Sequence, residues 1–193
     1  MPDPHIIDEL ILSRRSVKPA QFDPGKKVPD EVVRQAIFNA TWAPTHGKTE
    51  PWHFIVFTGD GLKKLAEFQS ELYKKDAGEK FTEAKYQKLI SQPLLTSHMI
   101  AICMKRDVNS KIPEIEEVEA VACAVQNIYL TITAYGYGGY WTTGGPTYNE
   151  NAKAFFGLQE QDKLLGFFCI GQVAIQPERG ARKSIEEKSI WIR

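Results

Sequence analysis

The sequence predicts one domain of mixed helix and sheet, an α+β fold that spans residues 1–193. Two kinds of pattern alternate along the chain. Apolar runs at residues 52–58, 99–104 and 164–174 are typical of buried strands. Between them, apolar residues recur at helical spacing. The 42% hydrophobic content supplies enough apolar material for an ordinary core.

Two helices are expected before the first strand. Residues 4–14 repeat isoleucine and leucine at helical spacing, and two prolines and a glycine within residues 16–28 predict a loop. The sequence Pro29-Asp30-Glu31 begins a second helix, because proline and acidic side chains favour the first helical turn. Pro44 ends that helix.

Residues 52–58 are nearly all apolar, so this strand is expected to be buried on both faces. Residues 59–73 predict a helix, and the charged residues 76–92 predict a surface helix with a loop on each side. A long helix over residues 114–135 is apolar on much of its circumference, which predicts a place at the centre of the domain.

Glycines at residues 136–139 are expected to end the long helix. A brief strand over residues 140–143 and a short helix over residues 149–156 follow. The last apolar run, residues 164–174, is the third buried strand. Residues 175–193 form a C-terminal arm with both charges and little core pattern.

Composition excludes some classes of function. The 24 basic and 24 acidic residues cancel, which argues against a nonspecific nucleic-acid binder or a protein of anionic membranes. No apolar run has the length of a membrane span or the character of a signal peptide. Cys103, Cys123 and Cys169 form no CxxC pair, so buried free thiols and a cytoplasmic location are expected.

Basic residues near both ends of the chain are the first candidates for a site. Arg14 and Arg15 can either satisfy the carbonyl end of the first helix or bind a phosphate through their planar guanidinium groups. Arg182 and Lys183 can belong to a solvated surface or converge on the same phosphate. The residues alone leave both alternatives open.

The other candidate residues do not indicate a metal site or a catalytic nucleophile. His46 lies in a polar loop, His98 begins a strand and is expected to be structural, and no histidine or cysteine spacing suits zinc. The sequence contains no recognisable nucleophile triad, and residues 136–139 follow a helix, unlike a dinucleotide-binding GxGxxG. Glu116, Glu117 and Glu119 are interpreted as a solvated helix face.

Several short motifs occur in a recognisable order. They are Arg14-Arg15-Ser16-Val17, Ala43-Pro44-Thr45-His46, Glu50-Pro51-Trp52-His53-Phe54, Tyr140-Trp141-Thr142-Thr143-Gly144 and Ile170-Gly171-Gln172. In this order and spacing the chain resembles the FMN-dependent nitroreductase family, particularly its small single-domain members. The resemblance covers nearly the whole chain and is weakest between residues 72 and 93. It implies an α/β/α sandwich with a mixed central sheet, and a homodimer that holds FMN at its interface.

The resemblance also implies which residues bind FMN. Arg14, Arg15 and Ser16 would hold the ribityl-phosphate end, with further positive charge from Arg182 and Lys183.

By the same resemblance, Trp141, Thr142 and Thr143 would lie along the isoalloxazine ring. Thr45 and His46 would reach FMN from the partner subunit.

The implied activity is a ping-pong transfer of hydride from NADH or NADPH through FMN to nitroaromatics, quinones or similar small acceptors. FMN carries this chemistry, so no protein nucleophile is required. Two positions depart from the family pattern, because Glu50 replaces a common glutamine and Thr142 stands where relatives carry arginine. Alternatives on the same scaffold are a flavin-storing or flavin-sensing protein, and a related flavin chemistry such as dehalogenation or flavin cleavage.

Overall fold

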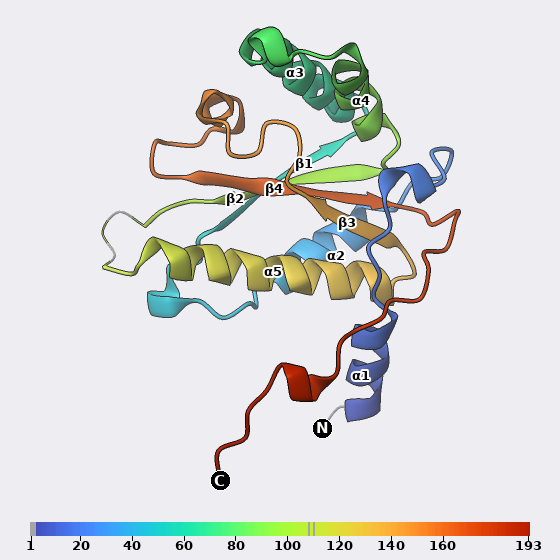
Figure 1. Cartoon of the computed structure of the whole chain (residues 1–193), viewed down its shortest axis with the longest axis vertical. Coiled ribbons are helices and arrows are strands. Elements are labelled where there is room, and N and C mark those ends of the chain that lie inside the picture. Colours follow the sequence, from blue (N-terminus) through green and yellow to red (C-terminus); the bar gives the residue numbers. More distant parts are fainter. Residues whose placement is uncertain (1–2, 108, 110) are drawn as a thin grey trace.

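The computed structural model describes residues 3–107, 109 and 111–193, and its centre is a four-stranded sheet between two layers of helices (Figure 1). The strands lie in the order β1-β2-β4-β3, and each neighbouring pair is antiparallel. Their bounds are β1 Trp52–Thr58, β2 His98–Met104, β3 Gly138–Thr142 and β4 Lys163–Gly171. The resemblance implied a mixed sheet, but all three strand pairs are antiparallel, and the parallel pairing is an isolated bridge between Ser16 and Gly139, outside the four strands.

One face of the sheet packs on helices α2 (Asp30–Ala40) and α5 (Glu114–Ala134), and the other carries α3 (Asp60–Asp76) and α4 (Glu83–Leu94). A separate apolar cluster fills each side of the sheet. Helix α1 (Pro4–Ser13) extends away from this body on the same side as the C-terminal segment. The predicted α+β sandwich is confirmed.

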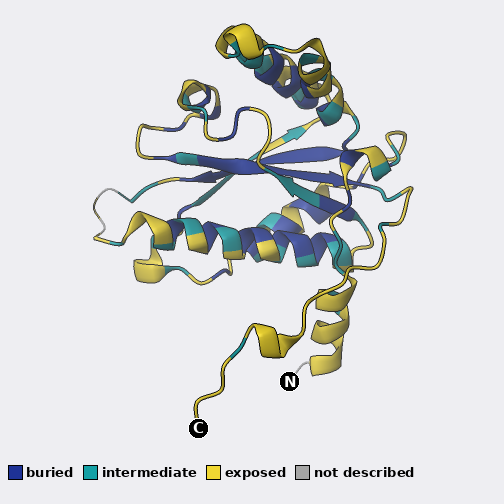
Figure 2. Cartoon of the chain, viewed as in Figure 1, coloured by how far each residue is buried: buried dark blue, intermediate teal, exposed yellow. Residues whose placement is uncertain are grey.

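Burial is greatest in the middle of the sheet (Figure 2). Every residue of β2 is buried, and so is every residue of β4 after Lys163. The prediction that residues 52–58 are buried on both faces is wrong. β1 lies at the edge of the sheet, and all its residues are of intermediate burial or exposed. It pairs with one neighbouring strand only, and both of its faces are partly open.

Strand β3 begins at Gly138, two residues before its predicted start, and ends at Thr142. A glycine is required at Gly139, because a Cβ atom there would lie 2.6 Å from the Phe168 ring. The last glycines of the 136–139 segment therefore allow close contact between strands in addition to ending α5. The sequence alone does not show whether a glycine in this segment ends the helix or allows close contact between strands.

The predicted surface helix over residues 76–92 begins later than expected. Helix α3 continues to Asp76, a single turn of 3₁₀ helix follows, and α4 begins after Thr82, whose hydroxyl accepts a hydrogen bond from the Lys85 amide. Residues 150–156 also form a 3₁₀ helix. Strand β4 ends at Gly171, three residues before the apolar pattern ends.

The cysteines are free, and two of them, Cys103 and Cys169, are buried as predicted. Cys123 is exposed on α5, so the expectation of burial is wrong for this thiol. None of the helices in the described part of the chain is long and apolar enough to cross a membrane.

Candidate functional site

A cavity of about 530 Å³ lies where the end of α1, helix α5, strand β3 and the C-terminal segment meet. Its size falls within the usual range of small-molecule sites. It brings together five of the residues singled out in the sequence. These are Arg14, Arg15, Ser16, Trp141 and Arg182.

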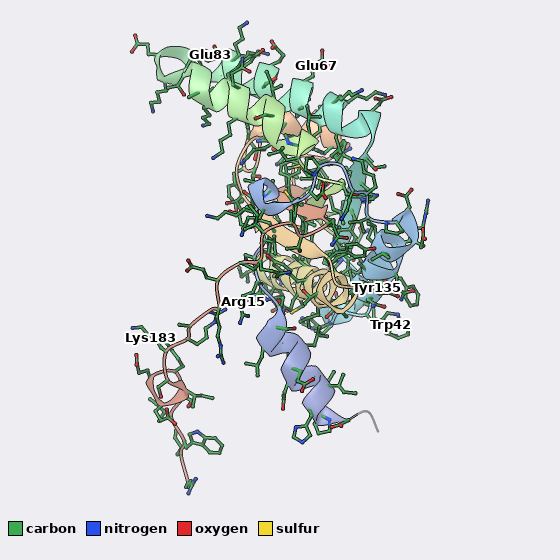
Figure 3. All side chains as sticks on the ribbon, turned by 90° about the vertical axis from the view of Figure 1, so that its right-hand side faces the viewer. Arg15, Trp42, Glu67, Glu83, Tyr135 and Lys183 are labelled. Atoms are coloured by element: carbon green, nitrogen blue, oxygen red, sulfur yellow. The ribbon has the colours of Figure 1, made fainter. Side chains whose placement is uncertain are left out.

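Three guanidinium groups from the two ends of the chain, those of Arg14, Arg15 and Arg182, line this cavity. A Cβ atom built on Gly180 would lie 3.4 Å from Arg15 Nε and 3.4 Å from Arg182 Nη1, so these two arginines flank the same glycine. Figure 3 shows Arg15 on the side of the molecule from which the C-terminal segment with Lys183 extends. Among the described residues, no carboxylate forms an ion pair with Arg14, Arg15 or Arg182.

The arginines are held by carbonyl groups rather than by acids. Arg15 Nη1 donates to the carbonyl oxygens of Leu12 and Arg14, at 2.7 Å each, so it caps the end of α1. Arg182 Nη1 donates to the carbonyl oxygen of Ala181 at 2.7 Å. Both readings of the Arg14-Arg15 pair are therefore compatible, since one guanidinium can cap a helix and still present other N–H groups.

Tyr129, from α5, supports this end of the cavity. Its hydroxyl oxygen lies 2.9 Å from the Gly139 carbonyl oxygen and 3.0 Å from Ser16 Oγ. Because the carbonyl can only accept, Tyr129 donates to Gly139, which leaves Ser16 to donate to Tyr129. The Arg14 guanidinium lies over the Tyr129 ring. Burial raises the pKa of the Tyr129 hydroxyl, against the opposing effects of Ser16 and Arg14.

A second cavity of about 470 Å³ continues from the first along β3. The two share Ala122 and Trp141, so they form one extended hollow. The Trp141 indole N–H donates to the Leu165 carbonyl at 3.3 Å, which fixes the ring between the two cavities. Thr142 and Thr143 also line the second cavity. No residue that lines either cavity is acidic.

Three predicted site residues lie outside these cavities. Lys183 is exposed and pairs with Glu187 at 3.6 Å. Thr45 and His46 belong to the loop before β1, where His46 Nδ1 lies 2.6 Å from Glu116 Oε2 at the start of α5. In a single chain this loop does not meet the arginines.

The loop before β1 has an unusual backbone. Gly47, Lys48 and Glu50 have φ angles of 61°, 55° and 45°. Only glycine adopts this left-handed region without cost, so two side-chain-bearing residues are held in strained conformations. Strain of this kind occurs where neighbouring structure fixes the chain, and the contact between His46 and Glu116 holds this loop against α5.

The interpretation of the α5 glutamates as a solvated face is wrong for Glu117, which is 1% exposed. Arg106 forms a salt bridge to Glu117 and donates to the Ile112 carbonyl. The Asp107 amide also donates to Glu117, at 3.3 Å. Helical periodicity locates Glu117 next to the apolar stripe of α5. It does not reveal its partner Arg106, which lies in the loop after β2. This network fixes that loop against α5.

The sequence also leaves Tyr129 and Gly180 unmarked as site residues. Tyr129 follows the apolar stripe of α5, so periodicity assigns it to the core, and Gly180 lies in a segment without pattern. His98 is structural as expected, because it is 2% exposed and hydrogen-bonds Asp30 at 2.9 Å. Within residues 3–107, 109 and 111–193, no cluster of histidine, cysteine and acidic residues could hold a metal ion.

Comparison with known proteins gives relatives over most of the chain. A solved nitroreductase-like family protein from Bacillus cereus is 31% identical, has a TM-score of 0.82, and is aligned over 96% of this chain and 95% of its own. The curated "Putative NAD(P)H nitroreductase YdjA" of Escherichia coli K12 is 29% identical over 84% of this chain and 86% of its own. The FMN-dependent nitroreductase NfnB of Mycobacterium smegmatis, solved with NADPH, shares the fold with a TM-score of 0.77, at 20% identity over 98% of this chain and 99% of its own.

The family model is decisive, because it covers most of the chain. The model described as "Nitroreductase family" matches residues 11–172, which include the arginine pair after α1, the whole sheet and every residue that lines the two cavities except Gly180 and Arg182. This match confirms the family that the sequence motifs suggested, and with it an oxidoreductase as the class of enzyme. The chain belongs to the nitroreductase family.

Proposed function

We propose that this protein is an FMN-dependent oxidoreductase that passes electrons from NADH or NADPH to nitroaromatics, quinones or similar small acceptors. One observation carries the proposal: three guanidinium groups that form no ion pair with any described acidic residue lie at one end of an extended hollow whose other end is uncharged. This arrangement suits a ligand with a phosphate at one end and a planar ring at the other.

The phosphate end of FMN would lie in the first cavity. Arg14, Arg15 and Arg182 would donate charge-assisted hydrogen bonds to it, and Ser16 would be held ready by Tyr129. The absence of acidic lining residues supports this assignment, since a carboxylate would compete with the phosphate for the same donors.

The isoalloxazine ring would lie in the second cavity. Trp141 provides an apolar wall whose orientation is fixed by Leu165, and Thr142 and Thr143 provide hydroxyl and backbone groups beside it. When bound, FMN accepts a hydride from the nicotinamide and delivers electrons to the acceptor. The protein residues bind it, orient it and exclude water from one side. The two half-reactions would alternate in a ping-pong cycle, and the protein would act in the cytoplasm.

The active form is proposed to be a homodimer. Apolar side chains on α1 and on the C-terminal arm are largely uncovered by the described residues: Leu12 is 70% exposed, Ile190 92% and Trp191 80%. Exposed apolar groups of this extent are typical of a protein–protein interface. In such a dimer, Thr45 and His46 would complete the FMN site of the partner, and Lys183 would lie near it.

Anaerobic stopped-flow spectroscopy tests the proposal. Protein loaded with FMN should lose its absorbance near 450 nm, roughly the oxidised-flavin band, on mixing with NADH or NADPH. Addition of 1,4-benzoquinone should restore the absorbance. Binding of FMN without reduction by either nucleotide would leave a flavin-storing protein and would exclude the reductase.

A further inference from the structure

Tyr148 combines an uncommon backbone conformation with a largely exposed side chain. Its φ angle is 64°, in the left-handed region, and it is 69% exposed. A bulky residue at positive φ is a genuine outlier, and such strain is tolerated mainly where the surrounding structure fixes the chain for a purpose. Tyr148 also lines the second cavity, together with Thr142 and Thr143.

The local turn does not require tyrosine. The Asn149 amide donates to the Pro146 carbonyl at 3.1 Å, so Tyr148 is the third residue of a turn in which positive φ favours glycine or asparagine. Thr147 is 9% exposed and its hydroxyl donates to the Gly144 carbonyl at 2.9 Å. Asn149 Nδ2 donates to Asp76 at 2.7 Å. These contacts impose the turn on Tyr148 from both sides.

Among the described residues, no polar or ring contact of the Tyr148 side chain offsets this cost. In the described part of the protein, neither its hydroxyl nor its ring takes part in a hydrogen bond, ring contact or ion pair. A glycine would form the same turn without strain and expose no apolar ring. The tyrosine is therefore explained better by a ligand than by folding.

The character of the second cavity indicates which ligand. None of its lining residues is charged, and aromatic or aliphatic side chains from α5, β3 and β4 dominate it. Positive charge is confined to the first cavity, at the other side of Trp141. The flavin ring proposed for this cavity and a molecule stacked on that ring would share this uncharged lining, so an uncharged, planar acceptor suits it better than an anion does.

We propose that Tyr148 is a specificity-determining residue, which stacks its ring on planar aromatic electron acceptors at the outer end of the second cavity. This inference rests on the proposed function, since it assumes reduced FMN beneath the acceptor. Tyrosine offers a large rigid surface with few rotatable bonds, and stacking on it favours flat acceptors over those without a ring face.

Oxidation of the reduced protein tests the inference without any nicotinamide. FMN-loaded protein is reduced with dithionite and mixed anaerobically with 1,4-benzoquinone or with ferricyanide, which has no aromatic face. Tyr148→Ala should lower the second-order rate constant for benzoquinone by about 2- to 12-fold, and leave that for ferricyanide unchanged. Tyr148→Phe should retain the wild-type rate for benzoquinone.

Two further variants separate this role from a structural one. Tyr148→Gly should lower the rate constant for benzoquinone by the same factor as Tyr148→Ala. It should also raise the melting temperature, because glycine relieves the strained φ angle. Tyr135→Ala removes a tyrosine that is 53% exposed and lines neither cavity, and it should leave both rates unchanged.

Several results would overturn the inference. Equal rate losses for the two oxidants would do so, as would a fall in FMN affinity in Tyr148→Ala, which would make Tyr148 a cofactor contact. Unchanged benzoquinone rates in Tyr148→Ala would also exclude it. Failure of the proposed function gives a different result, because wild-type FMN would then stay oxidised with NADH and NADPH although dithionite reduces it.

Discussion

The guanidinium carbon of Arg14 lies 4.7 Å from the centroid of the Tyr129 ring. The hydroxyl of the same tyrosine meets Ser16 and the Gly139 carbonyl. One residue of α5 therefore orders two residues that follow α1 and fixes them against β3. The Arg14 guanidinium is thereby held at the wall of the first cavity, and its five N–H groups exceed what Tyr129 can accept, so others are available to a ligand. The cavity is thus organised before any ligand binds.

Replacement of Arg14 by alanine should weaken FMN binding by about 1.5–3 kcal/mol, roughly 10- to 150-fold in dissociation constant, because a charge-assisted phosphate contact is lost. Quenching of FMN fluorescence during titration measures the change. Arg34→Ala is a matched control, since Arg34 is an exposed arginine of α2 that lines neither cavity of the proposed site. Wild-type affinity in Arg14→Ala would show that the phosphate lies elsewhere.

Replacement of Tyr129 by phenylalanine retains the ring beneath Arg14 but removes the hydroxyl. The Gly139 carbonyl still accepts from the Val17 amide at 2.9 Å, so it is not left without a donor. We expect the free energy of unfolding to fall by about 0.5–1.5 kcal/mol, the usual contribution of one hydrogen bond. FMN affinity should fall as well, because Ser16 loses its fixed partner.

Urea denaturation and FMN titration measure these two effects. Tyr135→Phe serves as the control, because Tyr135 is exposed and forms no side-chain hydrogen bond among the described residues. A loss of stability in Tyr129→Phe with unchanged FMN affinity would restrict Tyr129 to a purely structural role.

Most of the fold could be predicted because apolar periodicity reports burial directly. The central position of α5 and the complete burial of β2 both follow from local pattern. The prediction for β1 was wrong for a physical reason. An apolar run identifies a strand, but its place at the edge of the sheet depends on which strands pair, and pairing is set by the whole chain.

The site was less accessible to sequence reasoning, because it combines segments far apart in the chain. Motif order brought Arg14 and Trp141 to notice, and the structure places both at one cavity. Tyr129 was not predicted as a site residue, because its place on the apolar stripe of α5 assigns it to the core. The hydrogen bonds of its hydroxyl depend on neighbours that only the folded structure shows. Tyr148 was not predicted either, because its positive φ angle is a property of the folded turn, and a tyrosine in the sequence does not indicate such an angle.

The two buried thiols predict a pH dependence of stability. Burial raises the pKa of Cys103 and of Cys169 from 9.0 to about 12 in the folded chain. The folded state then retains protons that the unfolded state releases, so this contribution is fully present below pH 9.0 and is lost as the pH rises toward about 12. Stability should therefore decline above pH 9.0.

Urea denaturation of wild type and Cys169→Ala at pH 7.5 and pH 10 checks this effect. The decline between the two pH values should be smaller in the variant, because one of the two titrating thiols is absent. Cys123→Ala is the control, since Cys123 is exposed on α5 and should leave the decline unchanged. Equal declines in wild type and Cys169→Ala would contradict the prediction.

Glu117 and Glu119 are two glutamates of α5 with opposite surroundings. Glu117 is 1% exposed and pairs with Arg106, whereas Glu119 is exposed and forms no ion pair with any described residue. Glu117→Gln should lower the free energy of unfolding by about 3 kcal/mol, because Arg106, whose side chain is 18% exposed, would keep its charge without its counter-ion. Glu119→Gln, the same chemical change two residues away, should change it by no more than about 0.5 kcal/mol.

The Glu117 substitution should also act locally, because the Asp107 amide and the Ile112 carbonyl join the same network. Hydrogen exchange of the Asp107 amide should become faster in Glu117→Gln than in Glu119→Gln, beyond the change expected from global stability. Glu117 lines neither cavity, although the next residue, Val118, lines the second one. We therefore expect FMN affinity in Glu117→Gln to stay within about threefold of wild type at temperatures where the variant is folded. A larger loss of FMN affinity would mean that the loop after β2 is coupled to the site, which no contact in the described part of the chain suggests.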